Sequence, residues 1–313
     1  MKTQWESISV AQEERFSAFR ERKVQIEKDV HRTDRTQSYF EGDNNPNLVE
    51  LKNILMTYVM FNFDLGYVQV MLYITYVQVG DPSIVFTQMP QPKLKMHISV
   101  FFDTLSALIF LFIFQGMSDL LAPILFVMQN EVDSFWCFVG FMEQIGGNFA
   151  LDQGGMRDQL DHIGELQKVV DIEFHSYLVS KDSGNYFFCF RWLLIWFKRE
   201  FPFDDVMRLW EVMWAARPRV RNCQLLICAA ILQRAKSTVM ENKFGLTETL
   251  KHINDMAYEM NLEEVLVKAD AILRKLEDED FGSEPLRKIF KVNYNPEVDV
   301  VCDAEQANEV IEG

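Results

Sequence analysis

Two short motifs hold the polar side chains of this sequence that are best suited to chemistry. Ile26, Asp29 and Arg32 follow one another at three-residue spacing, and Tyr67 stands two residues before Gln69. A guanidinium is permanently charged and presents a planar fork of donors, while a carboxamide donates and accepts at once. Such a pair could stabilise charge on phosphate oxygens and hold a water molecule. Either motif alone can occur by chance in a chain of this length.

The elements around these motifs are predicted to be helical. Apolar residues recur at helical spacing over residues 48–60, so a helix is expected between the two motifs. Residues 11–30 are highly charged with few apolar side chains, which predicts a solvent-facing helix. Residues 31–47 are polar and include Gly42 and Pro46, which is typical of a loop.

The rest of the chain also favours an all-α fold built from many helices. No long stretch alternates with period two, and glycine and proline stand between the periodic segments. Residues 186–201 are almost wholly apolar and predict a buried central helix that Pro202 ends. Asn261 and Glu264 resemble a capping box that opens a helix to residue 276. Further helices are expected over residues 158–179, 204–216, 222–235 and 246–259.

Composition excludes several classes of protein. The 313 residues carry a net charge of −15, which disfavours nonspecific binding of nucleic acid through a basic surface. The five cysteines show no CxxC spacing and are expected to be small buried side chains, and the scattered histidines support no zinc site. No glycine-rich phosphate loop or nucleophile elbow is present. The polar N-terminus lacks the apolar core of a secretory signal, so a reducing, cytoplasmic location is expected.

The end of the chain differs from the rest. Residues 277–313 contain eleven acids and three bases, a net charge of −8. This predicts a disordered or loosely attached acidic tail after a domain that covers residues 1–276.

The order of the two motifs and their flanking sequences resembles the TBC (Tre-Bub-Cdc) domain of Rab GTPase-activating proteins. Within that family the chain is most similar to the vertebrate subgroup of members fifteen and seventeen. The similarity covers most of residues 1–275 outside 70–115. It is carried by the stretches IEKDVHRTDRT, LMTYVMFNFDLGYVQ, GMSDLLAPILFVMQNEVDSFWCF, DSGNYFFCFRWLLIWFKREFPF and LKHINDM.

The resemblance implies a fold of two helical lobes and an activator that has no turnover of its own. It implies that Arg32 is an arginine finger and Gln69 a glutamine finger, with Ile26, Asp29 and Tyr67 in support. The expected partner is a Rab-family GTPase in its GTP-bound state, which carries the GTP and Mg²⁺, so no cofactor or metal of this chain is expected. Vesicle trafficking is the implied setting, with recruitment to organelle membranes through the Rab and without nucleic acid or stable membrane insertion.

The sequence departs from the family pattern in two places. The family domain usually begins further upstream, so the N-terminal lobe is expected to be incomplete. Residues 70–115 also interrupt the family sequence directly after Gln69, and their removal regenerates GYVQGMSDLLAPIL. This 46-residue insertion could be a translated intron, a native loop or packing helix, or a membrane anchor through residues 98–114, which have 13 apolar side chains of 17 and contain Asp103. The alternative functions are therefore a catalytically impaired helical Rab-binding scaffold and a membrane-tethered helical protein.

Overall fold

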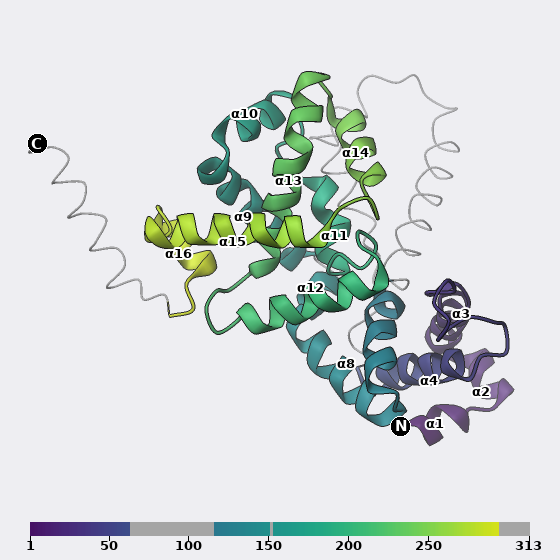
Figure 1. Ribbon diagram of the computed structural model, residues 1–313. Helices are drawn as coiled ribbons and strands as arrows, with labels where there is room; N and C mark the ends of the chain where they lie inside the picture. The colour runs from purple at the N-terminus through teal and green to yellow at the C-terminus, as the bar shows by residue number, and fades with distance from the viewer. Residues whose placement is uncertain (63–115, 151–152, 294–313) are drawn as a thin grey trace, which may run out of the picture. The chain divides into compact units, whose positions relative to one another are not determined.

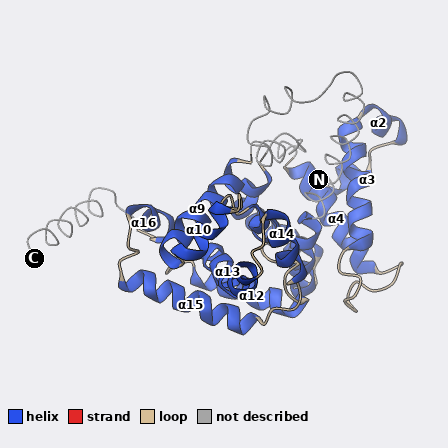
Figure 2. Ribbon diagram, turned by 90° about the horizontal axis from the view of Figure 1, so that it is seen from above, coloured by secondary structure: helices blue, strands red, loops and turns tan. Residues whose placement is uncertain are grey.

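The computed structural model describes residues 1–62, 116–150 and 153–293, and all regular secondary structure in these ranges is helical (Figures 1 and 2). The all-α prediction is thus confirmed for this part of the chain. The chain divides into two compact units, Met1–Gly155 and Met156–Gly313. No helix in the described ranges is long and apolar enough to cross a membrane. Residues 98–114 lie outside them.

The first unit is built on the helices that carry and support the first motif. α3 packs on α4, and α4 also packs on α8 and α1. Its helices are α1 (Lys2–Glu6), α2 (Val10–Arg15), α3 (Ser17–Arg32), α4 (Pro46–Phe61), a helix over residues 116–128, α8 (Glu131–Ile145) and the 3₁₀ turn η1 (Gly146–Phe149).

α4 confirms the helix predicted over residues 48–60. Pro46 occupies its first turn, where no backbone N–H is needed, and the Asn45 side chain caps it by accepting from the N–H of Asn47 at 2.8 Å. Its apolar face is buried, and Tyr58 meets Phe138 of α8 edge to face with ring centroids 4.9 Å apart. α4 therefore joins the motif-bearing α3 to the rest of the unit.

The solvent-facing helix predicted over residues 11–30 is wrong in two respects. The chain breaks at Phe16 into α2 and α3, and α3 buries Phe19, Ile26 and Val30. These three side chains are few, but their spacing places them on one face of the helix. A narrow apolar stripe among many charges is enough to seat α3 on α4.

The second unit surrounds the apolar helix α13. Nearly every residue of α13 between Leu225 and Leu232 is inaccessible to solvent, and α10, α12, α14 and α15 pack on α13. Its helices are α9 (Gly154–Val170), α10 (Ile172–Ser180), η2 (Phe187–Cys189), α11 (Phe190–Leu194), α12 (Phe203–Ala216), α13 (Cys223–Glu241), α14 (Leu246–Asp255), α15 (Leu262–Asp278) and α16 (Glu284–Phe290). The helices expected over 204–216, 222–235, 246–259 and 261–276 correspond to α12 through α15.

Two of the longer predicted helices are divided. Residues 158–179 form α9 and α10, because the Asp171 side chain accepts from the N–H of Phe174 at 3.0 Å and starts a new helix. Residues 186–201 are buried as predicted but do not form one helix. Trp196 and Phe197 adopt positive φ values of 47° and 61°, and the Trp196 carbonyl accepts from the indole N–H of Trp210 at 2.8 Å instead of continuing a helix.

The broken segment is held by an ion pair. Arg191 Nε and Nη2 donate to the two carboxylate oxygens of Glu200 at 2.7 and 2.9 Å, and Glu200 is fully buried. A planar guanidinium matches a carboxylate through two parallel bonds. Arg191 therefore closes the turn that follows α11.

The prediction of a loose tail from residue 277 is wrong for residues 277–290. α15 extends to Asp278, and α16 buries Leu286 and Phe290 completely. Phe281 stacks on Phe290 with ring centroids 6.3 Å apart. The apolar side chains recur at helical spacing among the charges, and burying them stabilises the segment. Residues 294–313 lie outside the described part of the chain.

The cysteines follow the prediction in part. Cys189 and Cys228 are buried and Cys223 is half-buried, but Cys137 of α8 is exposed. The apolar neighbours of Cys137 misled the prediction, because a helix repeats every 3.6 residues and residues adjacent in sequence therefore need not share the buried face. Trp136 beside it is also exposed.

Candidate functional site

The last turn of α3 presents the arginine of the first motif at the surface. Ile26 and Asp29 are buried, at 2% and 1% exposure, whereas about a third of the Arg32 side chain (35%) is exposed. Arg32 Nη2 donates to Asp29 Oδ1 at 2.5 Å. The three-residue spacing of the motif therefore puts the apolar residue in the core, the carboxylate beneath the surface and the guanidinium above it.

A second donor holds the Asp29 carboxylate in place. Gln25 Nε2 lies 3.2 Å from each of the Asp29 oxygens, and Gln25 is itself buried. A buried carboxylate is costly unless it is paired and hydrogen-bonded. Asp29 meets both conditions, so Arg32 has a fixed and charged partner.

The backbone turns immediately after Arg32. Thr33 has extended backbone angles and ends α3, and Asp34 adopts a positive φ of 45°. The Thr33 hydroxyl donates to the carbonyl of Asp29 at 2.7 Å and lies 2.9 Å from the hydroxyl of Ser118. Sequence reasoning missed both hydroxyls as functional candidates. The only sequence signal was their position: Thr33 directly follows Arg32, and Ser118 is the third residue after the insertion.

Arg35 has a different environment from Arg32. It pairs with Asp43, whose side chain is largely exposed, at 2.9 Å. This ion pair closes the loop between α3 and α4. Arg35 therefore serves as a natural comparison for Arg32: a nearby arginine tied to the loop and not to a buried carboxylate.

The second motif is not placed by the structure. Tyr67 and Gln69, together with the insertion over 70–115, lie outside the described residues. The structure therefore brings together Ile26, Asp29 and Arg32.

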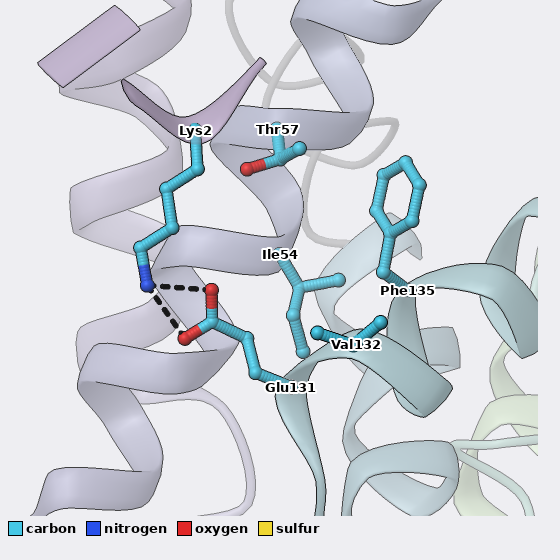
Figure 3. A pocket seen from close by; sticks show the side chains of 6 residues that line it. All are labelled: Lys2, Ile54, Thr57, Glu131, Val132 and Phe135. Atoms are coloured by element: carbon cyan, nitrogen blue, oxygen red, sulfur yellow. Dashed lines mark hydrogen bonds and ion pairs between the residues drawn. The ribbon is translucent and has the colours of Figure 1, made fainter. Parts of the chain in front are cut away.

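The first unit also contains a small cleft that residues outside the first motif line (Figure 3). Its volume is about 150 Å³, and its lining is mainly apolar. Lys2 Nζ contacts both carboxylate oxygens of Glu131 at 2.6 and 2.7 Å along one side. Since neither Asp29 nor Arg32 lines it, the cleft is not the site that the motif predicts. The residues that line it are Lys2, Ile54, Thr57, Glu131, Val132 and Phe135.

Comparison with known families identifies the family of the chain. The model of the family described as the Rab-GTPase-TBC domain matches residues 1–112 and 112–240. The chain belongs to this family. The TBC match includes α3 and the whole of the first motif, so the family that the sequence resembles is confirmed.

Individual relatives agree with this assignment. The chain is 45% identical over 276 residues to TBC1 domain family member 17 of Mus musculus, covering 88% of this chain and 36% of the relative. It is 32% identical over 237 residues to the GTPase-activating protein GYP7 of Saccharomyces cerevisiae, covering 76% of this chain and 26% of the relative. The chain thus spans about a third of the length of these curated TBC relatives.

A solved structure supports the fold. The crystal structure of the Ypt/Rab-GAP domain of Gyp1p matches with a TM-score of 0.58 at 18% identity, covering 83% of this chain and 74% of that one. At this identity the likeness concerns the fold alone. It supports the all-α TBC architecture independently of the sequence motifs.

Proposed function

We propose that this chain stimulates GTP hydrolysis by a Rab-family small GTPase in its GTP-bound state, acting as an activator without turnover of its own. The observation that carries the proposal is the placement of Arg32. Its guanidinium lies at the exposed end of α3 while the buried Asp29 carboxylate holds it from below. A rigidly anchored, surface-exposed arginine in a TBC domain is suited to enter the nucleotide site of a partner.

The chemistry requires positive charge where negative charge develops. As the γ-phosphoryl group leaves, charge grows on the oxygens between the β- and γ-phosphates, and a preorganised guanidinium stabilises it. An arginine supplied in trans is worth about 10³–10⁵ in rate. The partner would bring GTP and Mg²⁺, so the contribution of this chain is positioning and electrostatics, with no covalent intermediate.

Gln69 completes the proposed mechanism. By the family resemblance, its carboxamide accepts from the attacking water and donates toward phosphate, and Tyr67 supports its segment. Contact with the Rab would also bring the chain to organelle membranes. Neither nucleic acid nor stable insertion in a bilayer is part of this proposal.

A catalytically impaired Rab-binding scaffold is the second candidate, and the insertion favours it. Residues 70–115 directly follow Gln69, so they lengthen the chain beside the proposed glutamine finger by 46 residues. A long insertion next to a positioned side chain can move it away from the reacting atoms, and a displacement of about 1 Å can cost about 100-fold in rate. Binding would then persist without stimulation.

The test is single-turnover GTP hydrolysis by a panel of purified Rab proteins. The chain is compared with its Arg32→Ala and Gln69→Ala variants and with a form that lacks residues 70–115. Arg35→Ala is the matched control, because it removes a neighbouring arginine that pairs with an exposed aspartate. We expect stimulation that each finger substitution abolishes and Arg35→Ala preserves.

The other outcomes separate the candidates. Stimulation that survives the loss of both Arg32 and Gln69 would refute the two-finger mechanism. Rab binding with stimulation only after deletion of residues 70–115 would support the impaired scaffold. Absence of both binding and stimulation with every Rab would overturn the proposed function.

A further inference from the structure

We propose that the hydroxyl groups of Thr33 and Ser118 position Arg32 for catalysis. The inference rests on the proposed function and adds two positioning residues to it. Thr33 directly follows Arg32, and Ser118 belongs to the helix over residues 116–128. Their hydroxyls link the end of α3 to that second helix.

Two hydrogen bonds connect the Thr33 hydroxyl to its surroundings. Thr33 Oγ1 lies 2.7 Å from the carbonyl oxygen of Asp29, which can only accept, so Thr33 is the donor of this bond. Thr33 Oγ1 also lies 2.9 Å from Ser118 Oγ, within hydrogen-bond distance between two hydroxyl groups.

Burial makes these bonds consequential. Thr33 is 2% exposed and Ser118 is 0% exposed, so water cannot replace either partner. A buried polar group that loses its partner bears its desolvation penalty in full. The bond from Thr33 also gives a donor to the Asp29 carbonyl, which lies in the last turn of α3, where helix carbonyls need partners from outside the regular helix pattern.

The bonds form a continuous path to the guanidinium. Ser118 holds Thr33, Thr33 holds the backbone of Asp29, and the Asp29 carboxylate holds Arg32 Nη2. Ser118 is 85 residues from Thr33 along the chain. The position of the Arg32 anchor thus depends on a second helix and not on α3 alone.

The experiment measures kcat and KM for GTP-loaded Rab with the full chain and its variants. Thr33→Val removes both hydroxyl bonds with little change in shape, and Ser118→Ala removes one. Each should lower kcat about 10- to 100-fold with KM nearly unchanged, because binding persists while the arginine is misplaced. Thr33→Ser keeps the hydroxyl and should retain most of the activity. If only the form that lacks residues 70–115 stimulates hydrolysis, the same substitutions are made in that form.

Two control variants separate this effect from a general loss of packing. Thr57→Val in α4 also removes two bonds, in a half-buried position: the Thr57 hydroxyl donates to the Asn53 carbonyl at 2.7 Å and accepts from the Trp5 indole N–H at 3.1 Å. Ser134→Ala in α8 removes a fully buried hydroxyl whose oxygen has no hydrogen-bond partner among the described residues. Both controls should leave kcat within about twofold of the unmodified chain.

The decisive measurement adds the affinity of Thr33→Val and Ser118→Ala for GTP-loaded Rab. If the hydroxyls act through Arg32, each variant loses stimulation while its affinity for the Rab stays within about twofold of that of the unmodified chain. A parallel loss of binding and stimulation would overturn the proposal, because it would show a general structural effect. Full activity of Thr33→Val and Ser118→Ala, in a chain that Arg32→Ala inactivates, would overturn the positioning role and leave the proposed function intact. Absence of stimulation in both the full chain and the form that lacks residues 70–115 would overturn both.

Discussion

Replacing Asp29 by alanine should affect both the stability of the protein and its activity. The substitution removes the acceptor of Gln25 Nε2, at 3.2 Å, and of Arg32 Nη2, at 2.5 Å. It leaves the backbone carbonyl of residue 29, and with it the bond from Thr33, in place. The side-chain anchor of Arg32 and the acceptor of Gln25 are therefore lost, while the backbone contact with Thr33 remains.

The expected loss of stability follows from the burial of each partner. Gln25 is only 7% exposed, so its amide loses a bond to a charged acceptor that water cannot replace, at a cost of about 1.5–3 kcal/mol. The Arg32 side chain is 35% exposed, so solvent compensates most of its loss and its share is at most about 1 kcal/mol. The free energy of unfolding should fall by about 1.5–4 kcal/mol in total.

Urea denaturation and the GTP hydrolysis assay together test this reasoning. Asp29→Ala should lower both stability and stimulation. Arg32→Ala should abolish stimulation and also lower the free energy of unfolding, by about 1–3 kcal/mol, because it removes an ion-pair partner of the buried Asp29 carboxylate. Asp29→Asn keeps the shape and one acceptor oxygen, so it should be intermediate. An Asp29→Ala variant as stable as the unmodified chain, or one that stimulates fully, would refute the role of the buried carboxylate.

Three further predictions concern the second unit and the thiols. Glu200→Gln should lower the free energy of unfolding by about 2–3 kcal/mol in urea, because it removes a buried charge that Arg191 contacts twice. Phe290→Ala should cost about 3–5 kcal/mol in the same measurement, since Phe290 is fully buried at the end of α16. Maleimide at pH 8 should modify the exposed Cys137 but not Cys189, because burial raises the pKa of the Cys189 thiol, and peptide mass spectrometry resolves the two sites.

Each of these predictions has a control. Arg274 pairs with Asp270 one helical turn away at the surface, so Arg274→Ala should change the stability by less than about 0.5 kcal/mol. An equal effect of Glu200→Gln and Arg274→Ala would contradict the role of burial. An unchanged stability of Phe290→Ala would show that α16 does not pack in solution. Cys189 should become reactive in urea, and its rapid modification in the folded chain would contradict its burial.

Local sequence patterns predicted the helices correctly where the stabilising contacts lie between residues close together in the chain. Asn261 caps α15 by accepting from the N–H of Glu264 at 3.1 Å, as the capping-box pattern predicts. Hydrophobic periodicity failed over residues 186–201. A segment that is apolar on every side shows no distinct helix face, so its sequence does not reveal where a helix breaks. Its break at Trp196 is stabilised by a bond from Trp210, which lies fourteen residues further along the chain.

The candidate site likewise combines contacts between neighbours in the sequence with contacts that depend on the fold. The family resemblance implies that Asp29 supports Arg32, and their three-residue spacing on α3 lets the two side chains pair. The contact of Gln25 with the same carboxylate also lies within one turn of α3, but its importance depends on the depth at which α3 is buried against α4. Burial of a mostly charged helix is decided by the surface it meets, which its own residues do not specify.

The sequence by itself determined the all-α class, the TBC family and the Ile26, Asp29 and Arg32 motif, because periodicity and motif spacing are properties of neighbouring residues. The tertiary structure alone decided that the Asp29 carboxylate is buried and that Ser118 reaches Thr33 across 85 residues of chain. A hydrogen bond between two hydroxyls acts only at about 3 Å, so it forms only once packing has brought two distant segments together. The motif therefore specifies which groups could act, and the packing of α3 and the helix over residues 116–128 specifies how they are held.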